Sequence, residues 1–134
     1  MLAGSHFAQS APTSITVYKT ATCGCCSKWV DHLRTHNFDV RAIDVEDIAA
    51  VKRTYGVPPE LGSCHTAVVG GYVVEGHVPG EAVARMLRER PAIAGLTVPG
   101  MPIGSPGMEV PGRSEPYEIL SFDRAGKSQV YERR

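Results

Sequence analysis

Three of the four cysteines stand within four consecutive positions, in the sequence TCGCC, directly before an amphipathic segment. Cys23 and Cys26 have C-x-x-C spacing, which places two thiols one helical turn apart and allows a reversible disulfide. Cys25 adds a thiol that can trap another disulfide or bind a soft metal with its neighbours. Zinc sites usually use two separate ligand pairs, whereas crowded thiolates suit Cu(I), which tolerates low coordination and bridging sulfur. The cluster is therefore a thiol redox centre, a soft-metal site or a set of inert thiols, and Cys25 favours the metal.

The residues on either side of the cluster predict a strand, a turn and a helix. Residues 15–20, ITVYKT, alternate β-branched and polar side chains, as a half-buried strand does. After the turn, Cys26, Trp29, Val30 and Leu33 have the spacing of an apolar helical stripe. The cysteines thus lie at a helix N-terminus, where free backbone N–H groups and the helix dipole favour thiolate over thiol.

The rest of the chain predicts one α/β domain with the element order β-α-β-α-β-β-α. Apolar residues alternate in the expected strands and recur every three to four positions in the expected helices. The signals are a strand at 38–45, a short helix closed by Gly56, two strands joined at Gly70-Gly71 and a helix stopped by Pro91. This order is that of thioredoxin-like domains, and we assign residues 15–134 to one such domain.

The loop before the third strand of that order contains SCHT. In thioredoxin-like domains this loop carries a cis-proline that packs against the C-x-x-C pair. We therefore expect Cys64 and His65 to face the cysteine cluster, which would bring four thiols and an imidazole together. An ordinary buried cysteine near a strand start is the alternative for Cys64.

Residues 95–116 contain three Pro-Gly steps and no periodicity, and they predict a long loop. A β-hairpin that turns between Asp123 and Lys127 is expected after it. Met101 and Met108 lie in the loop, off any helical stripe, and thioether sulfur is a soft ligand for Cu(I). We expect these methionines either to reach a metal from a lid or to have no ligand role.

Other candidate ligands have more ordinary explanations. His32 and His36 share a helix face at i, i+4 spacing, but polar neighbours predict a solvated face rather than a metal pair. Met86 lies on the apolar stripe of the third expected helix, which predicts a core residue. For His77 two roles remain open, a structural hydrogen bond or support of the residues that bind the metal.

Composition excludes several classes of function. A chain of 134 residues with 43% hydrophobic content can bury one domain core, so its cysteines are not needed as staples. Fourteen basic residues balance fourteen acidic ones without a basic cluster, which excludes nucleic acid as a partner. No apolar run reaches the ~18 residues of a membrane span.

Residues 1–14 are expected to be a disordered N-terminal segment or the remainder of a signal peptide. Ala8-Gln9-Ser10 has the small-x-small form of a signal-peptidase site, although the charged and long apolar parts are absent. A vector remnant around Gly4-Ser5-His6 is the other interpretation. The segment leaves the compartment open.

Three motifs, TCGCCSKWVDHL, SCHTAVVGGYVVEGHVPG and GLTVPGMPIGSPGM, together resemble bacterial copper-resistance proteins of the CopG type, a metal-binding family of unknown function. The resemblance covers about residues 15–125. It implies a periplasmic, thioredoxin-like protein that binds copper and is sometimes found beside exporters and copper chaperones. The residues that correspond to the family motifs are Cys23, Cys25, Cys26, Cys64, His65, Glu75–Pro79, Met101 and Met108.

We therefore predict a copper-binding protein in which Cys23, Cys25, Cys26 and Cys64 hold Cu(I), with sulfur bridging several ions. Closure of Cys23 and Cys26 to a disulfide would couple copper valence to thiol redox state, as in a copper/thiol oxidoreductase. A thiol-disulfide oxidoreductase acting on proteins is the alternative, and a passive copper store is a third hypothesis.

Overall fold

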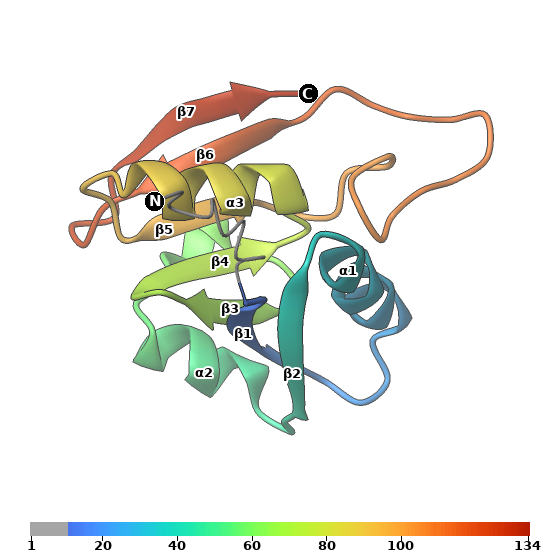
Figure 1. Ribbon diagram of the computed structural model, residues 1–134, viewed down its shortest axis with the longest axis horizontal. Helices are drawn as coiled ribbons and strands as arrows, with labels where there is room; N and C mark the ends of the chain where they lie inside the picture. Colours follow the sequence, from blue (N-terminus) through green and yellow to red (C-terminus); the bar gives the residue numbers. More distant parts are fainter. Residues whose placement is uncertain (1–10) are drawn as a thin grey trace, which may run out of the picture.

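A mixed β-sheet with strand order β2-β1-β3-β4-β5-β6-β7 forms the centre of the molecule (Figure 1). The computed structural model describes residues 11–134. The strands are β1 (Thr13–Lys19), β2 (Phe38–Asp44), β3 (Thr66–Val69), β4 (Tyr72–Gly76), β5 (Gly95–Val98), β6 (Glu118–Phe122) and β7 (Ser128–Arg133). The helices are α1 (Gly24–Thr35), α2 (Ile48–Thr54), α3 (Gly80–Glu89) and the short 3-10 helix η1 (Pro59–Leu61).

The predicted order β-α-β-α-β-β-α and the C-terminal hairpin are confirmed. β1 pairs with β2 in parallel and with β3 in antiparallel orientation, and β3 continues into β4 through the expected Gly70-Gly71 turn. β6 and β7 form the expected hairpin. The chain is thus a single mixed α/β domain.

Alternating side chains of the sheet divide the interior into two cores. Val69 and Val74 point into the larger core, whereas Val68 and Val73 belong to the smaller one, because neighbours on a strand face opposite ways. The larger core contains α1 and α3 through Trp29, Val30, Leu33, Ala82, Val83 and Met86. The smaller core contains Val57 and Leu61, and α2 lies against β1 and β3. The predicted apolar stripe of α1 and the core position of Met86 are confirmed.

The predicted loop over 95–116 is wrong at its start, where Gly95–Val98 form β5. This strand runs parallel to β4 and antiparallel to β6, and all its residues are buried. A Cβ at Gly95 would overlap the carbonyl oxygen of Val73, so the absence of a side chain permits the pairing. The nearby Pro-Gly steps predict a loop, whereas this four-residue strand forms because β4 and β6 pair with it on either side.

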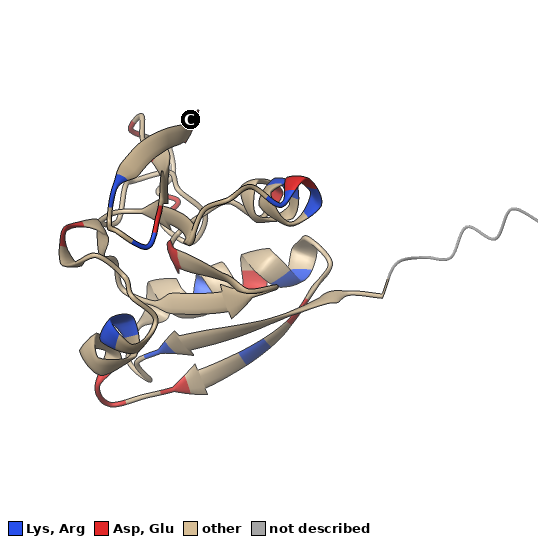
Figure 2. Ribbon diagram, turned by 90° about the vertical axis from the view of Figure 1, so that its left-hand side faces the viewer, with Lys and Arg blue, Asp and Glu red and all other residues tan. Residues whose placement is uncertain are grey.

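The N-terminal prediction lies mostly outside the described residues. β1 begins at Thr13, so the last two residues of the expected segment 1–14 belong to the sheet, and residues 1–10 are outside the description. Among residues 11–134, no helix has the length and apolar character needed to cross a membrane. Charges of both signs are interspersed over the helices and strands (Figure 2).

His32 and His36 are half-buried rather than on the fully solvated face that the sequence predicts. His32 Nε2 accepts a hydrogen bond from the Gly80 backbone N–H at 2.9 Å, and His36 Nε2 lies 2.9 Å from Glu81 Oε1. A Cβ at Gly80 would lie 2.6 Å from the His36 ring. The two histidines therefore join α1 to the start of α3, His32 through a helix N-terminal N–H group and His36 through the Glu81 carboxylate, and these contacts exist only after the helices pack.

A buried carboxylate fixes the segment that leads into β3. Glu75, at the end of β4, is fully buried and is paired with Lys52 of α2. It also accepts hydrogen bonds from the Ser63 backbone N–H at 2.8 Å and from Thr66 Oγ1 at 2.6 Å. Glu75 thus holds both ends of the short segment 63–66, which carries Cys64 and His65 between its ends.

The Pro-Gly loop crosses the start of α1 at Gly107. The φ of this glycine is +93°, and a Cβ there would lie 2.9 Å from both Cys25 O and His77 Nδ1, and 3.1 Å from the Trp29 backbone nitrogen. A side chain at this position would therefore push the loop away from α1. Only glycine combines the left-handed backbone with this close approach.

We predict that Lys52→Met lowers the free energy of unfolding by about 3–5 kcal/mol, because it leaves a buried carboxylate without its cation. The Lys52→Met/Glu75→Gln double variant should recover part of that loss, since it removes the stranded charge. Chemical denaturation of the reduced proteins measures both effects. A loss below ~1 kcal/mol for Lys52→Met would mean that the pair behaves as an exposed one.

Gly107→Ala should destabilise the protein more than Gly112→Ala does. Both glycines have positive φ, but a Cβ at Gly112 meets nothing within 4 Å. Backbone strain alone costs about 1–2 kcal/mol at each site, and overpacking should add about 1–3 kcal/mol at Gly107. Denaturation midpoints of the two variants provide the comparison, and equal losses would contradict close packing of the loop.

Candidate metal centre

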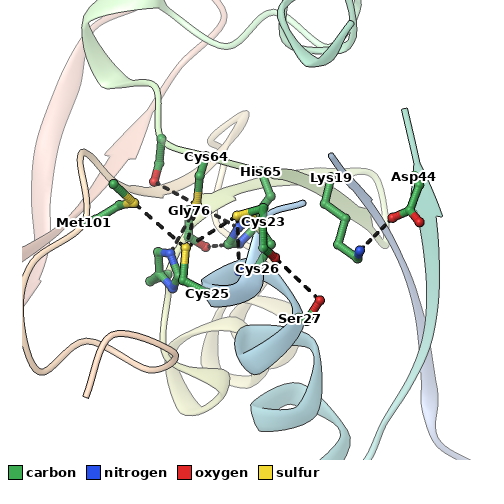
Figure 3. Close-up of a disulfide and its surroundings, with 12 residues drawn as sticks. Lys19, Cys23, Cys25, Cys26, Ser27, Asp44, Cys64, His65, Gly76 and Met101 are labelled. Carbon is green, nitrogen blue, oxygen red and sulfur yellow. Dashed lines mark hydrogen bonds and ion pairs between the residues drawn. A yellow bond between two sulfur atoms is a disulfide. The ribbon is translucent and has the colours of Figure 1, made fainter. Parts of the chain in front are cut away.

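The predicted cysteine pair caps the first turn of α1 (Figure 3). Cys23 is the N-cap residue, and its Sγ accepts a hydrogen bond from the Cys26 backbone N–H at 3.3 Å. Cys23 and Cys26 are joined in a disulfide, with Cys26 fully buried. The C-x-x-C spacing thus gives the disulfide that the sequence allows.

Cys25 and Cys64 are free thiols that complete a cluster of four sulfur atoms. Cys25 Sγ lies 3.4 Å from Cys23 Sγ and 4.0 Å from Cys64 Sγ. All four sulfur atoms lie within 4.8 Å of one another. The expectation that the loop before the third strand brings Cys64 to the cluster is confirmed.

Two buried histidines direct ring nitrogens at Cys64. His65 Nε2 lies 2.8 Å from the Gly76 carbonyl oxygen, and His77 Nδ1 lies 2.8 Å from the Pro106 carbonyl oxygen. A carbonyl oxygen only accepts, so each of these nitrogens carries the proton. The unprotonated nitrogens, His65 Nδ1 and His77 Nε2, each lie 3.2 Å from Cys64 Sγ. One thiol proton cannot satisfy two acceptors, and a bound cation would satisfy both.

Burial sets the charge state of these groups. It raises the pKa of the Cys64 thiol to about 11, and the neighbouring Cys25 acts in the same direction. Burial also lowers the pKa of His77, and it lowers the pKa of His65 well below its usual range, with His77 adding to that shift. Cys64 is therefore protonated and both imidazoles are neutral near pH 7. A metal ion at Cys64 would displace the thiol proton.

The two loop methionines differ in their relation to the cluster. Met101 Sδ lies 3.9 Å from Cys25 Sγ, and 51% of the residue surface is exposed (Figure 3). Met108 is half-buried and is bonded through its backbone to Ser105 and Gly104, without a sulfur contact to the cluster in the described chain. The structure thus places only Met101 of the two against the cysteines.

Trp29 supports the histidine side of the centre. Its ring packs against the His65 ring with 4.3 Å between centroids, and its Nε1–H donates to the Val78 carbonyl oxygen at 2.8 Å. The rings of His65 and His77 meet edge to face, with 5.0 Å between centroids. This packing restricts the orientation of both imidazoles.

The contacts of His77, Glu75 and Lys52 go beyond the sequence prediction. The motif EGHVP contains two of these residues, but their roles depend on which backbone groups lie opposite them. Lys52 lies on α2 with no motif around it, and its role follows only from the packing of α2 beside β3. Glu75 within the otherwise apolar strand YVVEG was the available signal, because an acidic residue that such a strand buries needs a partner.

The arrangement can do two kinds of chemistry. With the Cys23–Cys26 disulfide reduced, it offers four thiolates, two imidazole nitrogens and a thioether, a soft donor set that suits Cu(I). With the disulfide formed, it is a disulfide centre with two free thiols, Cys25 and Cys64, beside it.

Comparison with known proteins identifies the family. A family model described as a protein of unknown function, DUF411, matches residues 61–108, which include Cys64, His77 and both loop methionines. No curated protein matches the chain. Two solved structures, of the copper resistance protein CopG in form 1 and form 2, have TM-scores of 0.87 and 43% identity over 92% of this chain and 98% of theirs. Identity of 43% over almost the full length of both chains shows that this chain belongs to the CopG family of copper resistance proteins.

Proposed function

We propose that this protein binds copper, preferably Cu(I), through Cys23, Cys25, Cys26 and Cys64. The observation that carries the proposal is the position of these four sulfur atoms within 4.8 Å of one another in a member of a copper resistance family. Thiolates are soft ligands, and a soft ion is the best match to a site built from sulfur.

The donor set supports binding of more than one ion. Four sulfur atoms at this separation cannot serve several ions separately, so they would have to bridge. His65 Nδ1 and His77 Nε2, both directed at Cys64, supply two nitrogen ligands on the buried side. Met101 supplies a thioether on the exposed side. Met108 would bind copper only if the loop moved and brought its sulfur to the cysteines.

Cys23 and Cys26 also give the site a redox function. Closure of their dithiol to the disulfide releases two electrons and two protons, enough to reduce two Cu(II) ions to Cu(I). The N–H group of Cys26 and the helix dipole favour Cys23 as a thiolate, which promotes this closure. Copper supplies the one-electron acceptor when it is bound, and the cysteines supply the electron pair.

We further propose that the domain is thioredoxin-like and works in the periplasm. The strand order β2-β1-β3-β4 and the C-x-x-C pair at the start of α1 support the first assignment. An oxidising compartment allows the disulfide to persist, which supports the second. A copper chaperone or exporter would supply or receive the ion there.

The Cys23–Cys26 disulfide favours one other candidate, a thiol-disulfide oxidoreductase that acts on proteins. Against it, Cys64 and His65 occupy the loop that faces the disulfide, where a substrate strand would have to bind. Rapid reduction of insulin by the metal-free protein would support this alternative over copper binding.

Cys25→Ser should lower the number of Cu(I) ions bound per chain. Cys25 is the cysteine in contact with both Cys23 and Cys64, so its loss removes a bridging sulfur while the Cys23–Cys26 pair remains intact. Anaerobic titration of reduced protein with Cu(I) against a competing chelator gives the stoichiometry. Ser27→Ala, on the next exposed position of α1, is the control and should bind as the wild type does. Unchanged stoichiometry in Cys25→Ser would refute the shared cluster.

The two methionines should differ in the same titration. Met101→Leu removes a thioether 3.9 Å from Cys25 Sγ and should weaken Cu(I) affinity roughly tenfold, about 1.4 kcal/mol. Met108→Leu, the matched control in the same loop, should change the affinity far less if the loop keeps its position. Equal losses would mean that the loop closes over the metal and brings both sulfur atoms to it.

A further inference from the structure

The two free thiols and the disulfide form a compact group of sulfur atoms, all within 4.8 Å of one another. Cys64 Sγ lies 4.0 Å from Cys25 Sγ, which in turn lies 3.4 Å from Cys23 Sγ of the disulfide (Figure 3). The second separation is close to sulfur-sulfur van der Waals contact. A thiolate at this distance from a disulfide sulfur is within reach of thiol-disulfide exchange.

We propose that the protein moves its disulfide internally, from Cys23–Cys26 to Cys25–Cys64, with Cys25 as the relay. This activity goes beyond copper binding, because it needs neither a metal nor an external oxidant. It gives a role to Cys25, which a simple C-x-x-C redox centre does not need.

The exchange has two balanced steps. In the first, the Cys25 thiolate attacks Cys23 Sγ, a Cys23–Cys25 bond forms, and Cys26 leaves as a thiolate. In the second, the Cys64 thiolate attacks Cys25 Sγ, a Cys25–Cys64 bond forms, and Cys23 leaves as a thiolate. The protons given up by Cys25 and Cys64 end on Cys26 and Cys23, so one disulfide and two thiols are present before and after.

The surroundings of Cys64 fit its part in the second step. His65 Nδ1 and His77 Nε2 lie 3.2 Å from its sulfur, and either nitrogen can take the thiol proton as the Cys64 thiolate forms. The segment that carries Cys64 is held by the bonds of Glu75 to Ser63 and Thr66. Cys64 therefore stays beside Cys25 while the sulfur bonds exchange.

The product differs from the starting disulfide in what it connects. The Cys23–Cys26 bond closes a loop within the start of α1, whereas a Cys25–Cys64 bond would join α1 to the segment before β3. The exchange would free the dithiol of Cys23 and Cys26 while the chain keeps its two oxidising equivalents. The protein could then present this dithiol to an incoming reactant without first being reduced.

The test maps disulfides in the full chain with one disulfide and two thiols, in the presence of a copper chelator. The protein is incubated under nitrogen at mildly alkaline pH, quenched in acid, alkylated with N-ethylmaleimide and digested for mass spectrometry. We expect alkylated Cys23 and Cys26 together with a cross-linked Cys25–Cys64 peptide. Alkylation confined to Cys25 and Cys64 would overturn the proposal. Because copper is absent, the result is independent of whether the site binds copper.

Two variants identify the relay. In Cys25→Ser the Cys25–Cys64 peptide is lost, and Cys64 should remain a free thiol beside an intact Cys23–Cys26 disulfide, whereas Ser27→Ala should exchange as the wild type does. A bond from Cys64 to Cys23 or Cys26 in Cys25→Ser would show that no relay is needed and would overturn the role of Cys25. The Cys23→Ser/Cys26→Ser variant, which keeps only the product pair, should be oxidised by added diamide to an intramolecular disulfide with no free thiol. Failure to do so would also overturn the proposal.

Discussion

The buried carboxylate of Glu75 holds the half of the site that α1 does not supply. It is paired with Lys52 and bonded to Ser63 and Thr66, and Cys64 and His65 lie between these last two residues. A buried carboxylate without such partners would cost several kcal/mol, so the segment before β3 cannot move without breaking a costly network. The position of Cys64 relative to the cysteine helix depends on this constraint.

The same end of β4 also sets the chemistry around Cys64. Gly76 fixes the tautomer of His65 through its carbonyl oxygen, and His77 Nε2 lies 3.2 Å from the Cys64 sulfur. Both imidazoles are neutral and the thiol is protonated, so the pocket has more acceptors than protons. A site with this imbalance suits a cation that replaces the proton, or a thiol that must give its proton away. The proposed copper binding and the proposed disulfide exchange would draw on the same property.

The Pro-Gly loop completes the site by close packing rather than by its own secondary structure. Gly107 allows its backbone to touch the start of α1, the Pro106 carbonyl oxygen receives the His77 N–H, and Met101 lies against Cys25. The loop is therefore part of the wall of the site. Its sequence, rich in proline and glycine, suits a segment that must follow the surface of other elements in an irregular path.

Sequence by itself determined the element order, the stripe of α1 and the placement of three cysteines at its N-terminus, because these follow from local periodicity and spacing. It also indicated that Cys64 faces them, since the element order fixes which loop lies opposite. It did not show β5, whose strand character comes from pairing with β4 and β6. Tertiary structure alone decided the contacts of His32 and His36 with α3 and the tautomers of His65 and His77. It also decided that Met101 rather than Met108 lies against the cysteines. Each of these depends on which backbone groups and buried atoms from distant segments come within hydrogen-bonding or van der Waals distance, and no local pattern records that.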